Sequence, residues 1–377
     1  MELIFYLYIS LLIIFSVIYS GYLGIFLFGL TRINNEQNIQ KLPVSIIVPA
    51  RNEEDNLSSC LESLLNQSYP KELYEIILVD DDSDDSTAAI VKNFQERSSN
   101  VLLTSTSGIK TKLLSKVNAL NCGLKEASNN IILITDADCI VPFHWIEEIV
   151  SMFTNNVGLI CGFSAIIDKN EKSIWIKFQA IEYIIFLSLC AGGIGLKLII
   201  GATGQNMAFK KDEFLKFGGF EIMKNISSGE DVILLNNWMD LNNTAIKFCS
   251  SKKSIIKVKP VNNLKDLFNQ HKRWLSVAPK LARKIKIFYL TITSLNLLII
   301  TGIILLCFFP QLLIFLTLSL LIKIILELSI TIKGLHFYNR FDLLPYYFFY
   351  ELIQILFIFV IGIAAIFTRV NWKKRTF

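Results

Sequence analysis

Four short runs of apolar residues stand out in the first half of the chain. They are Val44 to Pro49, Glu75 to Asp80, Val101 to Leu103 and Ile131 to Ile134. Their length and their β-branched residues predict buried strands rather than helices. The polar stretches between them are long enough for the crossover helices of a parallel sheet.

Helical periodicity in these intervals completes the pattern. Leucines recur at helical spacing from Leu57 to Leu65, and Pro70 ends that segment. Ala88 to Phe94 begins a second helix, and Lys116 to Leu124 predicts the helix before the last strand. Strands that alternate with helices predict an α/β domain with a parallel, doubly wound sheet.

Four longer hydrophobic runs lie outside this pattern. Leu3 to Leu30 is long enough to cross a bilayer, and so are Ile287 to Phe309, Leu312 to Ile332 and Tyr346 to Thr368. The first run is too long for a cleaved signal peptide and has no basic region before it, so we expect an uncleaved anchor. The charged residues concentrate between these runs, which predicts a polar catalytic domain flanked by membrane helices.

Basic residues at the ends of the hydrophobic runs indicate their orientation. Arg32 and Lys41 follow the first run, and the positive-inside rule then places the N-terminus outside and the polar domain in the cytoplasm. Four spans leave the C-terminus outside, whereas the basic tail from Arg369 to Arg375 is typical of the cytoplasmic side. The sequence leaves this conflict open. The expected division is an anchor at 1–31, a catalytic domain at 42–280, membrane helices at 287–368 and a basic tail at 369–377.

The apolar stretch from Trp175 to Ile200 is ambiguous. It contains Lys177, Glu182 and Lys197 and a glycine-rich break, which argues against a membrane span. A single crossing here also separates the later polar motifs from the earlier ones. We expect an amphipathic segment that lies at the interface or lines an acceptor site, with a buried core helix as the alternative.

Composition excludes several classes of protein. The 377 residues are 53% hydrophobic, and the mean hydropathy of +0.49 is too high for a soluble protein. The net charge of +5 is modest, and the basic residues gather beside the hydrophobic runs, which indicates a membrane surface and no nucleic-acid partner. The seven cysteines form no C-x-x-C pair, so we expect neither a zinc site nor a disulfide framework.

Candidate chemistry lies at the carboxyl end of the fourth apolar run. Asp136 and Asp138 follow Ile134 and, two residues apart on an extended chain, project to the same side. Ligands of open α/β sheets bind at the carboxyl ends of strands, and paired carboxylates there suit a divalent cation that also holds a diphosphate. The alternative is an acidic turn that caps the helix near Pro142.

Several motifs, in the same order, resemble those of family 2 glycosyltransferases. The stretches that carry the resemblance are Val44 to Asn56, Glu75 to Thr87, Lys116 to Leu124, Thr135 to Asp138, Gly201 to Phe209, Ser228 to Asp231 and Gln270 to Trp274. The last resembles the Gln-x-x-Arg-Trp motif of membrane-embedded members. The resemblance implies an α/β, Rossmann-like nucleotide-sugar transferase domain of the GT-A type, with an N-terminal and about three C-terminal transmembrane helices.

The resemblance also implies roles for particular residues. Asp231 is the implied general base with Glu230 beside it, and Asp138 and Asp136 are the implied ligands of Mg²⁺ or Mn²⁺. Gly204 and Asn206 are implied on the acceptor side. The implied donor contacts are Pro49, Arg51, Asn52, Glu53, Asp81, Lys116, Asp136, Gln270, Arg273 and Trp274.

Simpler interpretations remain beside these roles. The acidic run around Asp81 is also typical of a solvated loop, and Asp82 stands where the family often has glycine. Lys116 is equally typical of an exposed helix charge. Glu230 and Asp231 precede a helical pattern, where carboxylates are favoured by the helix dipole. We expect His271, which shares an apolar stripe, to pack rather than to catalyse.

The implied activity is inverting transfer of a sugar from a nucleotide-diphosphate sugar, with UDP as the default. A lipid or other membrane-associated glycan is the expected acceptor, at the cytoplasmic face of a bacterial inner or plasma membrane. A processive polysaccharide synthase is the alternative enzyme. A membrane transport or scaffold protein with a degenerate transferase domain is the non-enzyme alternative.

Overall fold

The structure is a computed structural model in which two compact units can be described. It describes residues 2–33, 38, 40–168, 173–226, 229–241, 244–275, 281–367, 371–372 and 375–376. The helical unit comprises Met1–Arg32, Lys172–Ile200 and Lys265–Arg369, and the α/β unit comprises Ile33–Glu171, Gly201–Leu264 and Val370–Phe377. Each unit is therefore built from three separate segments of the chain.

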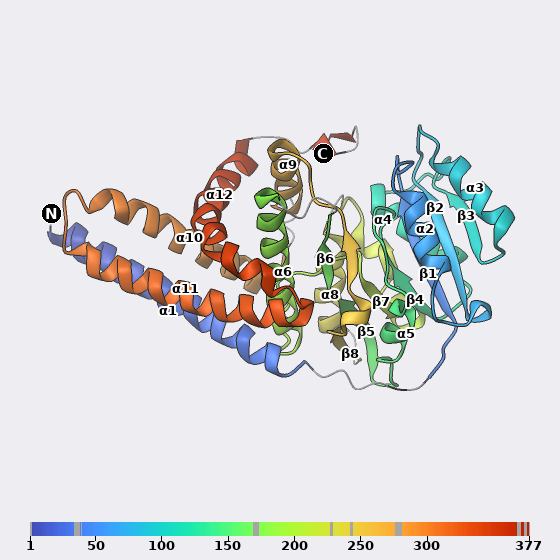
Figure 1. The fold of residues 1–377 in the computed structure, drawn as a ribbon, viewed down its shortest axis with the longest axis horizontal. Coiled ribbons are helices and arrows are strands. Elements are labelled where there is room, and N and C mark those ends of the chain that lie inside the picture. Colours follow the sequence, from blue (N-terminus) through green and yellow to red (C-terminus); the bar gives the residue numbers. More distant parts are fainter. Residues whose placement is uncertain are drawn as a thin grey trace. The chain divides into compact units, whose positions relative to one another are not determined.

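The core of the α/β unit is a seven-stranded sheet in the order β3-β2-β1-β4-β7-β5-β8 (Figure 1). Its strands are β1 (Val44–Ala50), β2 (Tyr74–Asp80), β3 (Val101–Ser105), β4 (Ile131–Ile134), β5 (Val157–Gly162), β7 (Met207–Lys210) and β8 (Ala245–Cys249). A smaller sheet pairs β6 (Ser164–Ile166) with β9 (Ile256–Val258) in parallel, and β10 (Asn371–Trp372) pairs with β11 (Arg375–Thr376). The four apolar runs predicted as strands are β1 to β4.

The sheet is mixed rather than wholly parallel, which corrects the sequence prediction. Strands β1, β2, β3 and β4 are parallel to one another, as expected. Strand β7 runs antiparallel to both β4 and β5. Parallel neighbours are usually joined by a crossover helix that belongs to the same α/β unit. The helix before β7 is α6, which belongs to the helical unit, so this reason for a parallel direction does not apply to β7.

Helix α4 packs against β1 and β2 at unusually short range. The helices of this unit are α2 (Leu57–Leu65), α3 (Thr87–Arg97), α4 (Ser115–Glu126), α5 (Trp145–Val150), α7 (Lys211–Lys216) and α8 (Glu230–Leu241). A Cβ atom on Gly123 of α4 would lie 2.5 Å from the Ile47 side chain of β1. Glycine at this position therefore lets α4 lie close to the sheet and carry its first turn to the strand ends.

Long apolar helices make up the helical unit (Figure 1). They are α1 (Glu2–Thr31), α6 (Ile174–Ile194), α10 (Arg283–Leu305), α11 (Leu312–Tyr338) and α12 (Tyr347–Phe367), with α9 (Leu264–Leu275) beside them. Helices α1, α10, α11 and α12 lie where the hydrophobic runs predicted membrane helices. Within the described residues, α1, α6, α10 and α11 are long and apolar enough to cross a membrane.

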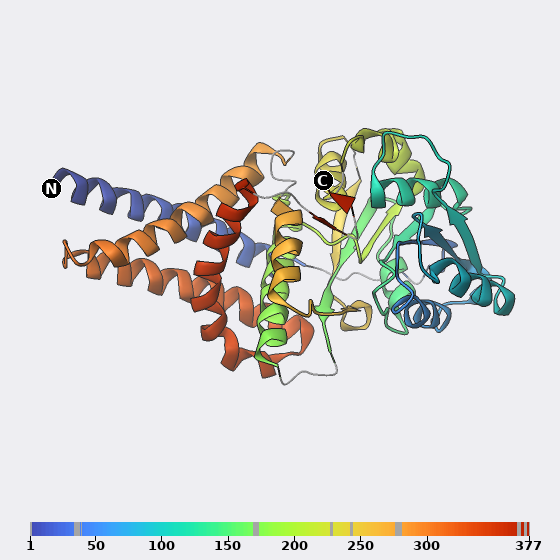
Figure 2. The ribbon, with the colours of Figure 1, turned by 90° about the horizontal axis from the view of Figure 1, so that it is seen from above.

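Helix α6 crosses α1 and α11 transversely, as both views show (Figure 2). Its crossing with α1 is a contact of backbones, because a Cβ on Gly29 would lie 1.9 Å from the carbonyl oxygen of Gly192. On α11, Gly334 faces Ser188 and Ile184. Buried residues occur on every side of α6, which matches the buried core helix named as the alternative to an amphipathic one.

A buried polar cluster joins α1, α11 and α12. Lys323 of α11 lies 2.9 Å from Glu327 and also pairs with Glu351 of α12. Tyr19 of α1 donates a hydrogen bond of 2.5 Å to Glu327, and Gln354 donates to both carboxylates at 3.0 Å. Because these side chains are almost fully buried, their polar groups depend on one another for partners.

Candidate active site

The loops after β1 and β2 are joined by hydrogen bonds at the carboxyl end of the sheet. The Arg51 guanidinium donates to the carbonyl oxygens of Asp81 and Asp82, the latter at 2.8 Å. The backbone nitrogen of Asn52 donates to Ser83 Oγ at 3.0 Å. Glu53, which is buried, continues the contact through its backbone nitrogen to Thr87 Oγ1 at 2.9 Å. The acidic run is therefore held against the loop after β1, while Asp82, Asp84 and Ser86 stay exposed and Asp85 accepts a hydrogen bond from the first residue of α3, as in the loop named as the alternative.

Asp82 takes the conformation that a glycine adopts readily. Its φ of 61° lies in the left-handed region, and so does the φ of 52° at Asn52. Aspartate and asparagine tolerate this region better than other residues with a side chain. Asp82 therefore has a backbone conformation that a glycine would also adopt at this position.

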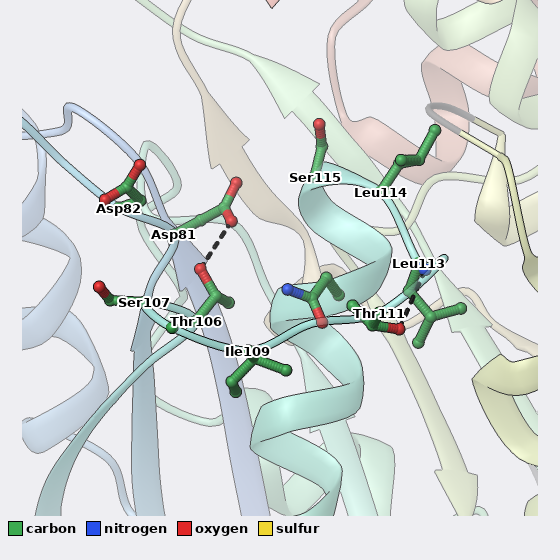
Figure 3. A pocket seen from close by; sticks show the side chains of 11 residues that line it. Asp81, Asp82, Thr106, Ser107, Ile109, Thr111, Leu113, Leu114 and Ser115 are labelled. Carbon is green, nitrogen blue, oxygen red and sulfur yellow. Dashed lines mark hydrogen bonds between the residues drawn. The ribbon is translucent and has the colours of Figure 1, made fainter.

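A pocket of about 380 Å³ opens beside Asp81 (Figure 3). The Asp81 side chain is 7% exposed, and Thr106 Oγ1 donates a hydrogen bond of 2.9 Å to its Oδ1. The pocket is lined by Asp81, Asp82, Thr106, Ser107, Gly108, Ile109, Thr111, Leu113, Leu114, Ser115 and Asn118. Its lining combines one buried carboxylate with hydroxyl groups and aliphatic side chains, a surface that suits a flat polar ring.

Asp136 and Asp138 lie in a turn and not on an extended strand. Strand β4 ends at Ile134, and the backbone nitrogen of Cys139 donates to the Asp136 carbonyl at 3.1 Å to close the turn. The extended geometry expected from the sequence is therefore wrong, because the ladder of β4 stops before the aspartates. The turn is fixed on its far side, where Ile140 pairs with Lys257 of β9.

One side of this turn packs against buried residues. The thiol of Cys60 donates to the Asp136 carbonyl at 3.6 Å. Burial, and after it the charges of Asp138 and Asp136, raise the pKa of Cys60 so that it stays a neutral thiol. Thr135, at the start of the turn, is buried, and its hydroxyl has no hydrogen-bond partner among the described residues.

Lys116 brings the turn after β4 together with the start of α8. Its Nζ lies 2.5 Å from Asp136 Oδ1 and 3.4 Å from Glu230 Oε1. Asp231 accepts a hydrogen bond of 3.1 Å from the backbone nitrogen of Gly204. Five predicted site residues from four separate stretches of the chain, with Gly204 among them, therefore meet in one cluster. The interpretation of Lys116 as an exposed helix charge is wrong.

The pKa of Asp231 is raised to about 7. Burial is the main cause, and the neighbouring charge of Glu230 adds to it. Hydrogen bonds from the backbone nitrogens of Val232 and Gly204 and the charge of Lys116 oppose the shift. A carboxylate with this pKa can accept a proton near neutrality, which is the property of a general base.

Asn206 occupies a position that differs from the implied acceptor contact. It is fully buried, and its Nδ2 donates to the carbonyl oxygens of Phe163 and Ser254 at 2.7 and 2.9 Å. Its Oδ1 accepts from Trp145 Nε1 at 2.9 Å. These bonds hold the start of β7 and so position Gly204, two residues earlier. We infer a positioning role for Asn206 rather than a contact with acceptor.

Gln270, Arg273 and Trp274 lie on α9, in the helical unit. The Trp274 ring stacks on Phe186 of α6, with ring centroids 6.3 Å apart. His271 pairs with Glu182 at 2.9 Å; burial lowers the pKa of His271, but Glu182 outweighs it and the net shift is upward. His271 therefore ties α9 to α6, in agreement with a packing role. The implied donor contacts of Gln270, Arg273 and Trp274 stay predictions.

Two residues of the α/β unit contribute to the site without any signal in a sequence motif. Thr106 holds the Asp81 carboxylate, and Trp145 holds Asn206. Both act across long separations in the chain, so periodicity and spacing did not mark them. Their roles are visible only in the structure, where each donates a hydrogen bond to a buried polar side chain.

Two family profiles match the chain. The profile described as glycosyl transferase family 2 matches residues 45–214, and the one described as glycosyl transferase family group 2 matches residues 131–368, more than half of the chain. The chain belongs to glycosyltransferase family 2. The turn after β4, which carries Asp136 and Asp138, lies within both matches of this glycosyltransferase.

Relatives of this glycosyltransferase have several different activities in their names. It is 31% identical over 189 residues to the probable glycosyltransferase YdaM of Bacillus subtilis, which covers 49% of this chain and 44% of the relative. It is 34% identical over 148 residues to poly-β-1,6-N-acetyl-D-glucosamine synthase of Staphylococcus epidermidis, covering 37% and 32%. Dolichyl-phosphate β-glucosyltransferase of Dictyostelium discoideum is 31% identical over 198 residues, covering 46% and 59%. The glycosyltransferase therefore matches less than two thirds of the length of each.

A solved structure shares the fold over most of this glycosyltransferase. It is the mannosyltransferase PcManGT from Pyrobaculum calidifontis in complex with GDP-mannose and Mn²⁺. The TM-score is 0.58 at 16% identity, and the alignment covers 87% of this chain and 99% of the other. At this identity the likeness concerns the fold alone.

Proposed function

We propose that the protein is a membrane-anchored, inverting glycosyltransferase that moves a sugar from a nucleotide-diphosphate sugar to a membrane-associated acceptor. The observation that carries the proposal is the cluster of Asp136, Lys116, Glu230 and Asp231 at the carboxyl end of the sheet. It supplies acceptors for a proton and contacts for a diphosphate in one place. Because the chain belongs to a glycosyltransferase family, we assign glycosyl transfer to this cluster.

Asp231 is the proposed general base. Its carboxylate is oriented by the backbone nitrogens of Gly204 and Val232, at 3.1 and 2.7 Å. An acceptor hydroxyl loses its proton as the new C–O bond forms, so a positioned carboxylate must take that proton. The raised pKa of Asp231 brings its proton affinity closer to what this transfer needs.

The pocket beside Asp81 is the proposed site for the nucleobase. Asp81 presents a carboxylate oxygen at a buried position, where it accepts hydrogen bonds but donates none. A base with an N–H on its pairing edge satisfies it, as uracil and guanine both do. Arg51, Asn52 and Glu53 support the wall of this pocket through the bonds between the two loops, and Pro49 lies in β1 beneath it.

The turn after β4 fits a divalent cation. Asp136 and Asp138 offer carboxylate oxygens, the ligand type that Mg²⁺ and Mn²⁺ prefer, and the Thr135 hydroxyl beside them has no hydrogen-bond partner in the described part of the chain. The described residues contain no group of three or more candidate ligands, so part of the coordination is left to the donor's phosphates. When bound, such a cation stabilises the charge of the leaving diphosphate.

A lipid-linked acceptor is the proposed partner, because the long apolar helices keep the enzyme at a membrane. The dolichyl-phosphate glucosyltransferase among the relatives acts on such a lipid by its name. The polysaccharide synthase among the relatives favours a second candidate, a processive synthase. The catalytic unit is proposed to face the cytoplasm, where nucleotide sugars are made.

Radiolabelled nucleotide sugars distinguish the candidates. Membranes that contain the protein are incubated with a panel of UDP- and GDP-sugars, and labelled products are separated into lipid-extractable, insoluble and soluble fractions. A lipid-extractable product supports the first candidate and a long insoluble polymer the second. No nucleotide release with any donor contradicts both and leaves a transport or scaffold protein.

The metal is tested on the purified full-length protein. EDTA should abolish turnover, and Mg²⁺ or Mn²⁺ should restore it. Asp138→Ala should lose turnover and weaken UDP binding in the presence of Mn²⁺, while its thermal unfolding stays close to wild type. Full activity in excess EDTA rules out the cation.

A further inference from the structure

Lys116 stands between the two acidic halves of the site. It lies in the first turn of α4, and its Nζ contacts Asp136 on the donor side and Glu230 on the acceptor side, at 2.5 and 3.4 Å. Gly204 lies against both side chains, because a Cβ at that position would lie 3.4 Å from Lys116 Nζ and 3.5 Å from Glu230 Oε1. One ammonium group therefore connects Asp136, a proposed metal ligand, to Glu230, the neighbour of the proposed general base Asp231.

The cluster has more carboxylates than cations, because three carboxylates act on the single ammonium group of Lys116. Asp136, Glu230 and Asp231 all act on its ammonium group, while its own side chain is only 25% exposed. The Lys116 ammonium group is therefore held between carboxylates that come from two different parts of the chain.

A divalent cation at Asp136 has to compete with this lysine. The Lys116 ammonium already occupies the Oδ1 side of the Asp136 carboxylate, and two cations on one carboxylate repel each other strongly at such short range. Glu230 gives Lys116 a second partner to move toward, because it lies within ion-pair distance. The geometry therefore contains both a competitor for the metal and a place for that competitor to go.

We propose that Lys116 is a positioning residue that holds Asp136 before the donor arrives, releases it to the divalent cation, and then pairs with Glu230 beside the base. This inference rests on the proposed function. Two consequences follow. The cation alone binds weakly, because it must displace an ammonium group. When the donor is bound, the Lys116 ammonium group pairs with Glu230 alone. It then offsets the negative charge of Glu230, and this favours the ionised form of the neighbouring Asp231.

Manganese binding tests the first consequence without any turnover. Mn²⁺ is titrated into the full-length protein without nucleotide, and free Mn²⁺ is followed by electron paramagnetic resonance. Lys116→Met should bind Mn²⁺ more tightly than wild type, because the cation no longer displaces an ammonium group. We expect a gain of about 10-fold, which corresponds to about 1.4 kcal/mol. In an Asp136→Asn background, Lys116→Met should bring no further gain. Equal or weaker binding by Lys116→Met overturns the proposal.

The pH dependence of turnover tests the second consequence. Loss of the lysine's charge should move the acidic limb of kcat, which reports the donor-loaded enzyme, upward by about one pH unit, because an opposite charge nearby favours ionisation of a carboxyl group. Lys116→Arg should restore the wild-type limb. Lys125→Met, which removes an exposed lysine from the same helix, is the matched control and should change neither measurement.

The two proposals fail in distinguishable ways. Wild-type protein that turns over no donor contradicts the proposed function, whatever the manganese titration gives. Active wild type whose acidic limb is unchanged in Lys116→Met contradicts the role of Lys116 alone. Thermal unfolding and circular dichroism confirm that each variant is folded, and Lys116→Gln, which also removes the charge, replaces Lys116→Met in both measurements if Lys116→Met does not fold.

Discussion

Asp231 is the residue on which the proposed chemistry depends most directly. Asp231→Asn keeps the size of the side chain but removes the proton acceptor. We expect kcat to fall by about 10²- to 10⁴-fold, the usual contribution of a general base, while UDP affinity measured by calorimetry stays near wild type. Asp240→Asn, an exposed position on the same helix, is the control. Normal turnover of Asp231→Asn would transfer the role to Glu230.

The acidity of Asp231 makes a separate prediction. Burial and the charge of Glu230 raise its pKa to about 7, and a base works only when it has lost its proton. In wild type, kcat/KM should therefore be constant above this pH and fall about tenfold per unit below it. A rate profile between pH 5 and 9 measures this. A limb that persists in the residual activity of Asp231→Asn assigns it to another group.

Individual contacts within the site mark the limit of what the sequence predicts. Asp136, Asp231 and Lys116 were found from motifs, because each belongs to a short stretch with a typical pattern. Their meeting was not visible, since Lys116 and Glu230 are distant in the chain and only the fold brings them within 3.4 Å. Asn206 was assigned to the acceptor by resemblance, whereas its burial and its three bonds give it a structural task.

Among the elements, the crossing of α1 and α6 gives the strongest prediction. A Cβ on Gly192 would lie 2.4 Å from the carbonyl oxygen of Phe26, which leaves no room even for a methyl group. Gly192→Ala should destabilise the protein by about 1–3 kcal/mol, as overpacking of a tight core does. Gly24→Ala is the control, because nothing lies within 4 Å of that position. Thermal unfolding in detergent measures both, and equal effects would contradict the crossing.

The elements also show why the first half of the sheet was easier to predict than the second. Strands β1, β2 and β4 are buried on both faces and appear as continuous apolar runs. Strand β7 has only four residues, Met207–Lys210, and follows a long excursion into another unit. Neither its position in the middle of the sheet nor its antiparallel direction has a local signal.

At the scale of the whole molecule, the buried polar cluster holds three helices together. Lys323→Met leaves Glu327 and Glu351 facing each other without a cation. Breaking a buried ion pair on one side typically costs about 3–5 kcal/mol, so this variant should unfold at a clearly lower temperature in detergent. Lys333→Met, exposed on the same helix, should not. Recovery of stability in Lys323→Met combined with Glu351→Gln would confirm that uncompensated charge causes the loss.

Membrane topology is a second prediction at this scale. If α1 and α11 span the bilayer, a helix that crosses them transversely lies along the membrane plane, so α6 does not carry the chain across. Cysteines introduced at Ser99 and Asn262, both exposed, should then resist an impermeant thiol reagent applied to intact cells. The same cysteines should react after the cells are opened. Labelling of the second position alone in intact cells would show that residues 175–200 span the bilayer.

The order of strands in the sheet has a consequence for the protein while it is being made. Strand β5 has β7 and β8 as its neighbours, and β4 has β7 on its second side, so these edges wait for residues that the ribosome adds later. At about 5–20 residues per second the wait lasts a few seconds. During it, one edge of β4 and both edges of β5 are open to pairing with other chains. A chain whose synthesis stops between Gly162 and Met207 keeps these edges unpaired, and we expect it to aggregate more readily than a chain with the whole sheet.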